Sequence, residues 1–218
     1  MARPKVPVQN LSDFIPLLSP SRPILVTTRF RDGRINVAPF SWCTPVSQKP
    51  PILALALLTI PRRQRSLINI LREGQFIVNL PGPDLAQRLV MASYWYPKGV
   101  NKLEFLAFET GQAQVLDLPV LAECRAHIEC RLQQAIPTGD HTLLIADVVA
   151  ASYDPEVFGQ GMLLDLERAA PLLHLRHFNT TDGQVHVFFT GRESRTYNVP
   201  FPPGAIDALG RPTGDEED

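Results

Sequence analysis

The sequence predicts a mainly β protein: an antiparallel barrel with a few short helices laid on its outside. Short β-branched and apolar segments recur along the 218 residues, only two or three segments have helical spacing, and strands and helices do not alternate regularly. Proline is abundant, with 21 residues, which suits punctuated strands and loops better than a helical bundle.

Three segments are expected to be helical, and capping residues mark their ends. Ser12 is the expected cap of the first helix, Ser66 is the expected N-cap of the second, and Gly74 stops that second helix. The third helix runs into an aromatic cluster, Tyr94-Trp95-Tyr96. The expected helices are Leu11–Leu18, Ser66–Glu73 and Asp84–Tyr96.

Strands are expected where β-branched or alternating apolar residues lie between turn signals. The segment Arg34–Ser47 is unusual, because Pro39 removes a ladder donor and should distort the strand. Residues alternate cleanly over Cys124–Leu132, so that one face is apolar and the other, which includes His127 and Glu129, is polar. The other expected strands are Pro23–Phe30, Ile52–Leu58, Gln75–Pro81, His141–Tyr153 (paired across a turn at Pro137–Asp140) and Gln184–Thr190.

Bulk composition narrows the class of protein. The 21 Lys and Arg residues nearly balance the 22 Asp and Glu residues, which argues against broad binding to nucleic acid or to an anionic membrane. The longest apolar run, Pro51–Ile60, is too short to cross a bilayer, and the N-terminus lacks a long apolar signal core. Cys43, Cys124 and Cys130 have no paired metal spacing. We therefore expect a cytoplasmic protein with reduced thiols and no metal site.

The chain is expected to form one domain over residues 1–205, with a core at about 12–153 and a C-terminal extension at 154–205. The last residues, 206–218, are acidic and contain Gly and Pro, so we expect them to be disordered.

An arginine cluster stands directly before the expected helix at Ser66. Guanidinium groups bind phosphate bidentately, and a helix N-terminus adds free N–H groups and the positive end of its dipole. Arg62, Arg63 and Arg65 can therefore form a compact anion site. A solvated basic loop has the same composition, and the cluster alone favours that simpler interpretation.

The segment Asn36–Trp42, NVAPFSW, is the second candidate. Pro39 bends the chain and exposes backbone N–H and C=O groups of its neighbours. The edge of a planar heteroaromatic ligand can use those groups, with Phe40 or Trp42 as apolar walls. Taken alone, an ordinary edge-strand bulge explains the segment better.

Several motifs occur together in one order along the chain: RPILVTTR, DGRINVAPFSW, VSQKPP, RRQRSLINILREGQFIVNLP and PTGDHTLLIADVV. As an ordered set they resemble the flavin reductase-like family, the FMN-binding split barrels. The resemblance covers about residues 12–153. It implies a mainly β fold with a few helices, an antiparallel Greek-key split β-barrel.

By this resemblance the interrupted strand lines the isoalloxazine edge of FMN, and Ser47 with the RRQRS segment holds the phosphate. Where the family usually shows Lys-Asp-Thr, this chain has Gln64-Arg65-Ser66, so the hydroxyl is kept and the carboxylate is lost. The arginine cluster is expected to supply the positive charge instead. The implied cofactor-binding residues are Thr28, Arg29, Asn36, Val37, Ala38, Pro39, Phe40, Ser41, Trp42, Cys43, Ser47, Arg62, Arg63, Arg65 and Ser66.

His141 corresponds to the family's histidine near the nicotinamide and flavin pocket, so the resemblance makes it the expected catalytic residue. Histidine titrates near neutral pH and can donate a hydrogen bond to a reduced, anionic flavin. A structural role in the tight turn after Gly139-Asp140 is the alternative. The aromatic cluster Tyr94-Trp95-Tyr96 resembles the region that meets the partner subunit near its flavin, although ordinary helix packing explains it equally well.

The resemblance implies a homodimeric FMN-dependent oxidoreductase. NADH or NADPH would deliver hydride to the flavin, and the reduced flavin would pass electrons to free flavin, ferric iron or a partner oxygenase. An FMN-binding electron carrier with no NAD(P)H activity of its own is the alternative function. A fold relative that has lost flavin and serves as a binding module is a third.

Overall fold

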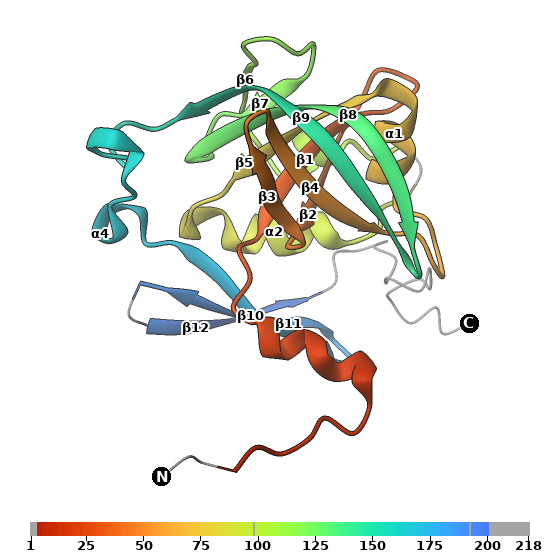
Figure 1. The fold of residues 1–218 in the computed structure, drawn as a ribbon, viewed down its shortest axis with the longest axis vertical. Helices are drawn as coiled ribbons and strands as arrows, with labels where there is room; N and C mark the ends of the chain where they lie inside the picture. The colour runs from red at the N-terminus through yellow and green to blue at the C-terminus, as the bar shows by residue number, and fades with distance from the viewer. Residues whose placement is uncertain (1–3, 98, 192, 201–218) are drawn as a thin grey trace.

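The computed structural model describes residues 4–97, 99–191 and 193–200. Its body is a seven-stranded antiparallel sheet in the order β2-β1-β5-β8-β9-β4-β3 (Figure 1). The two edge strands, β2 and β3, are consecutive in the chain, so the sheet curls into a barrel. The strands are β1 (Ile24–Arg29), β2 (Ile35–Phe40), β3 (Cys43–Gln48), β4 (Pro51–Leu58), β5 (Gln75–Leu80), β8 (Ala126–Thr138) and β9 (His141–Tyr153). The predicted fold class, a mainly β split barrel, is confirmed.

The barrel splits between β2 and β3, two residues later than the sequence predicted. Pro39 stays inside β2, paired with Leu25, and β2 tolerates it because it is an edge strand. The break lies at Ser41-Trp42, after which the chain leaves β1 and pairs with β4. The carbonyl of Trp42 accepts a hydrogen bond from the N–H of Ala56 at 2.9 Å, which fixes the point of divergence.

The helices match the prediction in place but not at every end. α1 (Arg65–Glu73) ends at Gly74, whose left-handed φ of 68° satisfies the expected stop. Ser66 is not the N-cap, because Gln64 takes that position and Ser66 lies buried in the first turn. Asn10, not Ser12, caps the first helix, a 3-10 helix (η1, Leu11–Leu18) whose side chains are all unburied.

α2 (Ala86–Ser93) ends before the aromatic cluster that was expected to be helical. Tyr94 is extended, with ψ at 153°, and this turn sends its ring into the core. The remaining described elements are η2 (Pro83–Leu85), α3 (Lys102–Phe105), β6 (Thr110–Gln112), β7 (Pro119–Leu121), η3 (Gln160–Met162), α4 (Leu166–Ala169), β10 (Leu172–Asn179), β11 (Gly183–Thr190) and β12 (Glu193–Pro200).

The alternating strand expected at Cys124–Leu132 is β8, which starts at Ala126 and continues to Thr138. The expected turn at Pro137–Asp140 is therefore shorter and comprises only Gly139 and Asp140. The apolar side faces the core as predicted, with Cys130 fully buried. The opposite side is only partly solvated: the segment around β6 and β7 covers Glu129 and leaves it 2% exposed, whereas Arg131 on the same side is exposed.

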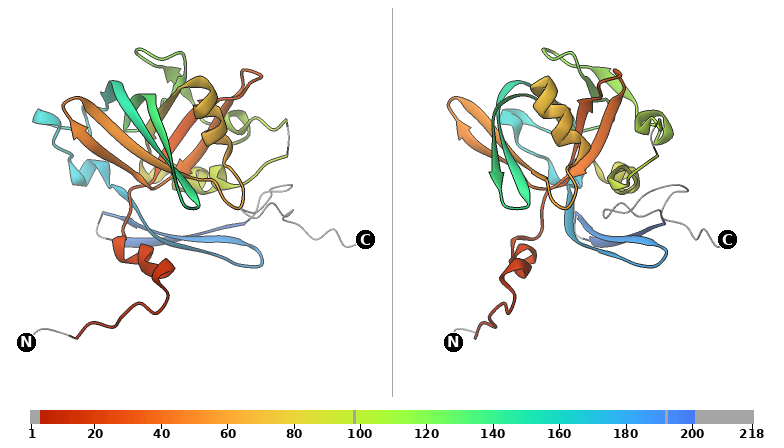
Figure 2. Two further views of the ribbon diagram at one scale, coloured as in Figure 1. Left: turned by 45° about the vertical axis from the view of Figure 1, so that its right-hand side comes forward. Right: turned by 90° about the vertical axis from the view of Figure 1, so that its right-hand side faces the viewer.

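The C-terminal extension forms a second, three-stranded antiparallel sheet, in the order β10-β11-β12. Figures 1 and 2 show this sheet as a separate layer under the barrel, and α2 packs against both β2 and β12. The Tyr94 hydroxyl donates to the carbonyl of Val199 at 2.8 Å, and Leu172 and Phe188 share a hydrophobic cluster with the Tyr94 ring. The single domain ending at residue 205 stays a prediction, and the expected disordered tail, 206–218, lies outside the described residues.

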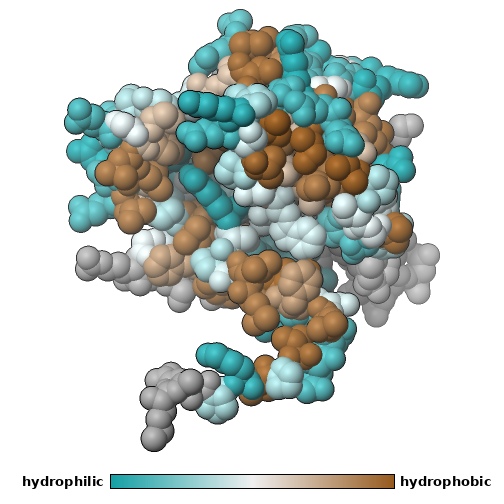
Figure 3. Space-filling model, viewed as in Figure 1, coloured by the Kyte–Doolittle hydropathy of each residue, from teal (hydrophilic) through white to brown (hydrophobic). Residues whose placement is uncertain are grey.

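Apolar side chains also gather on the surface. Figure 3 shows them over η1, below the barrel, where Leu11, Leu17 and Leu18 are 79%, 72% and 72% exposed. Within the described part of the chain, no helix has the length and apolar character needed to cross a membrane.

Candidate functional site

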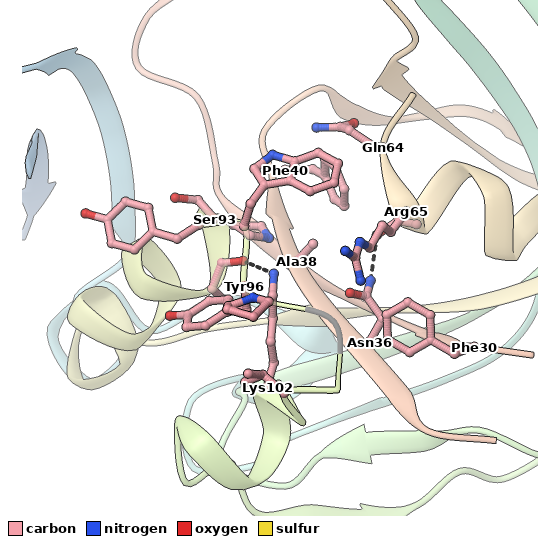
Figure 4. Close-up of a pocket in the computed structure, with 16 residues that line it drawn as sticks. Phe30, Asn36, Ala38, Phe40, Gln64, Arg65, Ser93, Tyr96 and Lys102 are labelled. Atoms are coloured by element: carbon pink, nitrogen blue, oxygen red, sulfur yellow. Dashed lines mark hydrogen bonds between the residues drawn. The ribbon is translucent and has the colours of Figure 1, made fainter. Parts of the chain in front are cut away.

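A pocket lies between β2, the N-terminal end of α1 and the chain that follows α2 (Figure 4). Strand, helix and loop each contribute one wall, so the site depends on tertiary packing rather than on one motif. Six of the predicted cofactor-binding residues line it: Asn36, Ala38, Pro39, Phe40, Arg65 and Ser66. The other lining residues are Phe30, Gln64, Ala92, Ser93, Tyr94, Trp95, Tyr96, Pro97, Val100 and Lys102.

A buried polar network holds α1 against β2 at the base of the pocket. The Asn36 amide donates to Ser66 Oγ at 2.9 Å and to Thr28 Oγ1 at 3.3 Å. The Asn69 amide donates to the same Thr28 hydroxyl at 3.0 Å. All four residues are buried. Thr28 therefore supports the site from behind, and Ser66 is a helix-anchoring residue whose hydroxyl borders the pocket.

Two of the three predicted arginines meet at one aromatic ring beside the pocket. The guanidinium carbon of Arg62 lies 3.9 Å from the Trp95 ring centroid, and that of Arg65 lies 5.5 Å from it. Burial lowers the pKa of Arg65 below its ordinary value, and the charges of Arg62 and Arg34 add to that effect. Arg63 is exposed and does not line the pocket. The N-terminal end of α1 is open toward this cluster, because no side chain caps it.

Lys102 reaches the pocket from α3 and was not among the predicted residues. Its ammonium donates to the carbonyl of Ala92 at 2.8 Å and to that of Val37 at 3.4 Å, and it lies 5.3 Å from the Tyr96 ring centroid. Burial, followed by the charge of Arg65, lowers the pKa of Lys102 from 10.5 to about 7. The described lining contains no Asp or Glu.

This lowered pKa makes a prediction about stability. Lys102 holds its proton less firmly in the folded protein than in the unfolded chain, so folding is penalised below pH 7 and the penalty fades as pH rises toward 10.5. Between pH 7 and 9 the unfolding free energy of the flavin-free parent should rise relative to Lys102→Met by up to about 1.4 kcal/mol per pH unit. Solvent screening reduces this value, since the residue is only half-buried. Urea unfolding at three pH values measures it. Lys49→Met, at an exposed site, should behave as the parent does.

His141 and Trp42 form a second cluster, outside the pocket lining. Their rings stack with centroids 4.5 Å apart, and His141 Nδ1 lies 2.7 Å from Asp140 Oδ1. That hydrogen bond is the main cause that lowers the pKa of Asp140. The carbonyl of Asp140 accepts the N–H groups of Thr59 and Ile60, which ties this hairpin tip to the segment that precedes α1. The catalytic role of His141 stays a prediction.

The remaining predicted residues do not line the pocket. Val37 faces the core and is fully buried, whereas Arg29 pairs with Asp117 at 2.8 Å. Burial raises the pKa of the Cys43 thiol to about 12, which suits a packed, unreactive group. Ser41 lies in the connection between β2 and β3, and Ser47 lies in β3 opposite Ile52.

The aromatic residues that line the pocket were noticed in the sequence but were assigned elsewhere. Tyr94 and Tyr96 are 2% and 5% exposed and belong to the core cluster, which agrees with packing as their main role. Lys102 gave a weaker signal, a single cation among the apolar residues Val100, Leu103 and Phe105. No sequence pattern places the two tyrosines or Lys102 opposite β2.

Comparisons with known proteins agree with this fold. The family model for the flavin reductase like domain matches residues 18–181. A flavin reductase (NADH) from Kitasatospora aureofaciens is 35% identical over 140 residues, which span 63% of this chain and 69% of that protein.

Two solved structures share the fold. Nitrilotriacetate monooxygenase component B from Bacillus cereus superposes with a TM-score of 0.71 at 19% identity, covering 92% of this chain and 100% of that one. Flavoredoxin from Methanosarcina acetivorans superposes with a TM-score of 0.68 at 20% identity, covering 95% and 96%. With the family model matched over most of its length, this chain belongs to the flavin reductase-like family.

Proposed function

We propose that the pocket binds FMN and that the protein is an FMN-dependent oxidoreductase, which takes hydride from NADH or NADPH and passes electrons to an acceptor. One observation carries the proposal: aromatic walls, two cations and an uncapped helix end meet in one pocket whose described lining has no carboxylate. A planar aromatic ligand with an anionic tail fits such a lining. The bound flavin would supply the redox chemistry, and the chain would position it.

The chain's own groups divide into three sets in this proposal. Arg65 and the N-terminal end of α1 neutralise the phosphate, with Arg62 close by at Trp95. The β2 residues Ala38, Pro39 and Phe40 form the wall for the ring and exclude water from one side of it. His141 remains the candidate for the nicotinamide side, held in place by Asp140 and by the stacked indole of Trp42.

We also propose a cytoplasmic homodimer. The apolar side chains of η1 are exposed in the single chain, and a partner subunit would remove them from water. The described cysteines, Cys43, Cys124 and Cys130, are free, as expected in a reducing compartment. A partner oxygenase is one candidate acceptor, in line with the likeness to a monooxygenase component.

An electron carrier without NAD(P)H activity is the second candidate. The fold that this chain shares with a flavoredoxin, over 95% of this chain, favours this function.

Anaerobic reduction separates the two functions. Oxidised flavin absorbs at about 450 nm. Purified protein loaded with FMN should lose this absorbance when NADH or NADPH is added. Dithionite serves as the control that the bound flavin is reducible at all. Full bleaching by dithionite, with none by either nicotinamide, would favour the electron carrier, and failure to take up FMN would contradict both.

A further inference from the structure

Two cations face the same pocket from different elements. Arg65 opens α1, and Lys102 reaches the pocket from α3, which packs against β2 (Figure 4). Each is close enough to the other for the charge of Arg65 to lower the pKa of Lys102. Two like charges that share a half-enclosed site repel each other, and a bound anion would offset this repulsion.

The groups that surround the Lys102 ammonium supply no such anion. β2 and α2 each offer a carbonyl, from Val37 and Ala92, and these are dipoles rather than charges. The tyrosine hydroxyls of the wall are neutral at physiological pH, since burial raises the pKa of Tyr94 to about 12 and that of Tyr96 still higher. On α3 itself, the neighbouring Glu104 is exposed, and no described carboxylate forms an ion pair with Lys102.

We propose that Lys102 is a specificity-determining residue, which takes up a proton when a ligand brings negative charge into the pocket and so selects anionic ligands. This inference rests on the proposed function, because it takes a flavin as the ligand. Negative charge can come from the phosphate of FMN or from the ring of a reduced flavin. In either case the anion is the missing counter-ion for Lys102 and Arg65, and it keeps the ammonium protonated.

The pH dependence of binding tests the proposal. An anion that binds only the protonated form of Lys102 should lose affinity as pH rises above 7, by up to tenfold per pH unit. Flavin-free protein is titrated with oxidised FMN and with riboflavin at pH 7, 8 and 9, followed by flavin fluorescence. The phosphate itself does not confuse this window, because its second ionisation lies near pH 6. A third titration, under anaerobic conditions, uses pre-reduced riboflavin.

Variants isolate the lysine. The affinity of Lys102→Met for each flavin should not fall between pH 7 and 9, apart from any change caused by ionisation of the flavin itself. Lys49→Met should keep the pH dependence of affinity that the parent has. Lys102→Arg stays charged over the whole range, so it should hold its affinity at pH 9. A thermal melt of each variant shows that it is folded, and the arginine variant keeps the test decisive where the methionine variant does not fold.

The outcomes are distinct. A Lys102-dependent slope with oxidised FMN but not with riboflavin supports the proposal with phosphate as the anion, and a slope confined to reduced riboflavin supports it with the ring as the anion. Equal pH dependence in the parent and in Lys102→Met, for all three ligands, overturns it while leaving the proposed function intact. Absence of any flavin binding by the parent contradicts the proposed function, and this inference with it.

Discussion

Replacement of Glu129 by alanine should destabilise the protein by several kcal/mol, although the residue lies on the side of its strand that the sequence marks as polar. The carboxylate is 2% exposed and accepts three hydrogen bonds from consecutive backbone N–H groups. Those groups belong to Gln114 (2.7 Å), Val115 (2.9 Å) and Leu116 (2.7 Å). A buried donor left without a partner costs about 1–3 kcal/mol, and the alanine variant leaves three.

The consequence should extend beyond the lost hydrogen bonds. The segment that Glu129 anchors places Leu116, Leu118 and Val120 over Ile77 in a small hydrophobic cluster. Loss of the anchor frees this segment, so the cover over β8 and β5 should open before the barrel unfolds. Hydrogen exchange at residues 114–116 should therefore speed up more than exchange in the strands of the barrel.

Urea unfolding measures the effect, with two comparison variants. Glu129→Gln keeps the shape and one acceptor oxygen but turns an amide donor toward N–H groups. Its unfolding free energy should therefore lie between those of the parent and Glu129→Ala. Glu156→Ala removes an exposed carboxylate and should change the unfolding free energy by less than about 0.5 kcal/mol. A Glu129→Ala protein within about 1 kcal/mol of the parent would show that water replaces the carboxylate in solution.

Glu129 also shows where sequence patterns stop being informative about the fold. Period-2 alternation tells which residues of β8 share a face, and it placed Cys130 in the core correctly. Alternation does not tell what covers the opposite face, because that depends on the path of a distant segment. Alternation therefore assigns Glu129 to the polar face and gives no sign that the structure uses it as a buried anchor.

The break in the barrel has a similar explanation. Pro39 is the local signal for a distorted strand, yet an edge strand accommodates it, and the division falls at Ser41-Trp42 because Trp42 is where β4 becomes the hydrogen-bonding neighbour. Competition between two neighbouring strands decides that position, and no residue in the segment encodes it alone.

The predicted cofactor-binding residues that line the pocket come only from β2 and the start of α1. Asn36, Arg65 and Ser66 stand there in ordered motifs, and their role in binding FMN stays a prediction. Lys102 closes the opposite side by a contact with Val37, which is 65 residues earlier in the chain. Such a contact follows from the packing of α3 on β2, and single-sequence patterns contain no record of it.

Replacement of Arg62 and Arg65 together by alanine should abolish most of the preference of the pocket for FMN over riboflavin. Charge-assisted hydrogen bonds contribute roughly 1.5–3 kcal/mol each, so the double variant should lose about 100-fold or more in FMN affinity. The structure selects this pair from the three predicted arginines, because both guanidinium groups meet at Trp95 beside the uncapped end of α1. The guanidinium of Arg63 has no described contact with the Trp95 ring and does not line the pocket, so Arg63→Ala should lose less FMN affinity.

Titration of each variant with both flavins separates a phosphate contact from general damage to the pocket. Riboflavin lacks the phosphate, so its affinity should stay nearly constant in the double variant, and Arg131→Ala, an exposed arginine of β8, should bind both flavins as the parent does. Equal losses for FMN and riboflavin would mean that the arginines act by holding the Trp95 wall. A larger loss in Arg63→Ala than in the double variant would place the phosphate on the outer side of the loop, where neither the end of α1 nor Lys102 could assist in binding it.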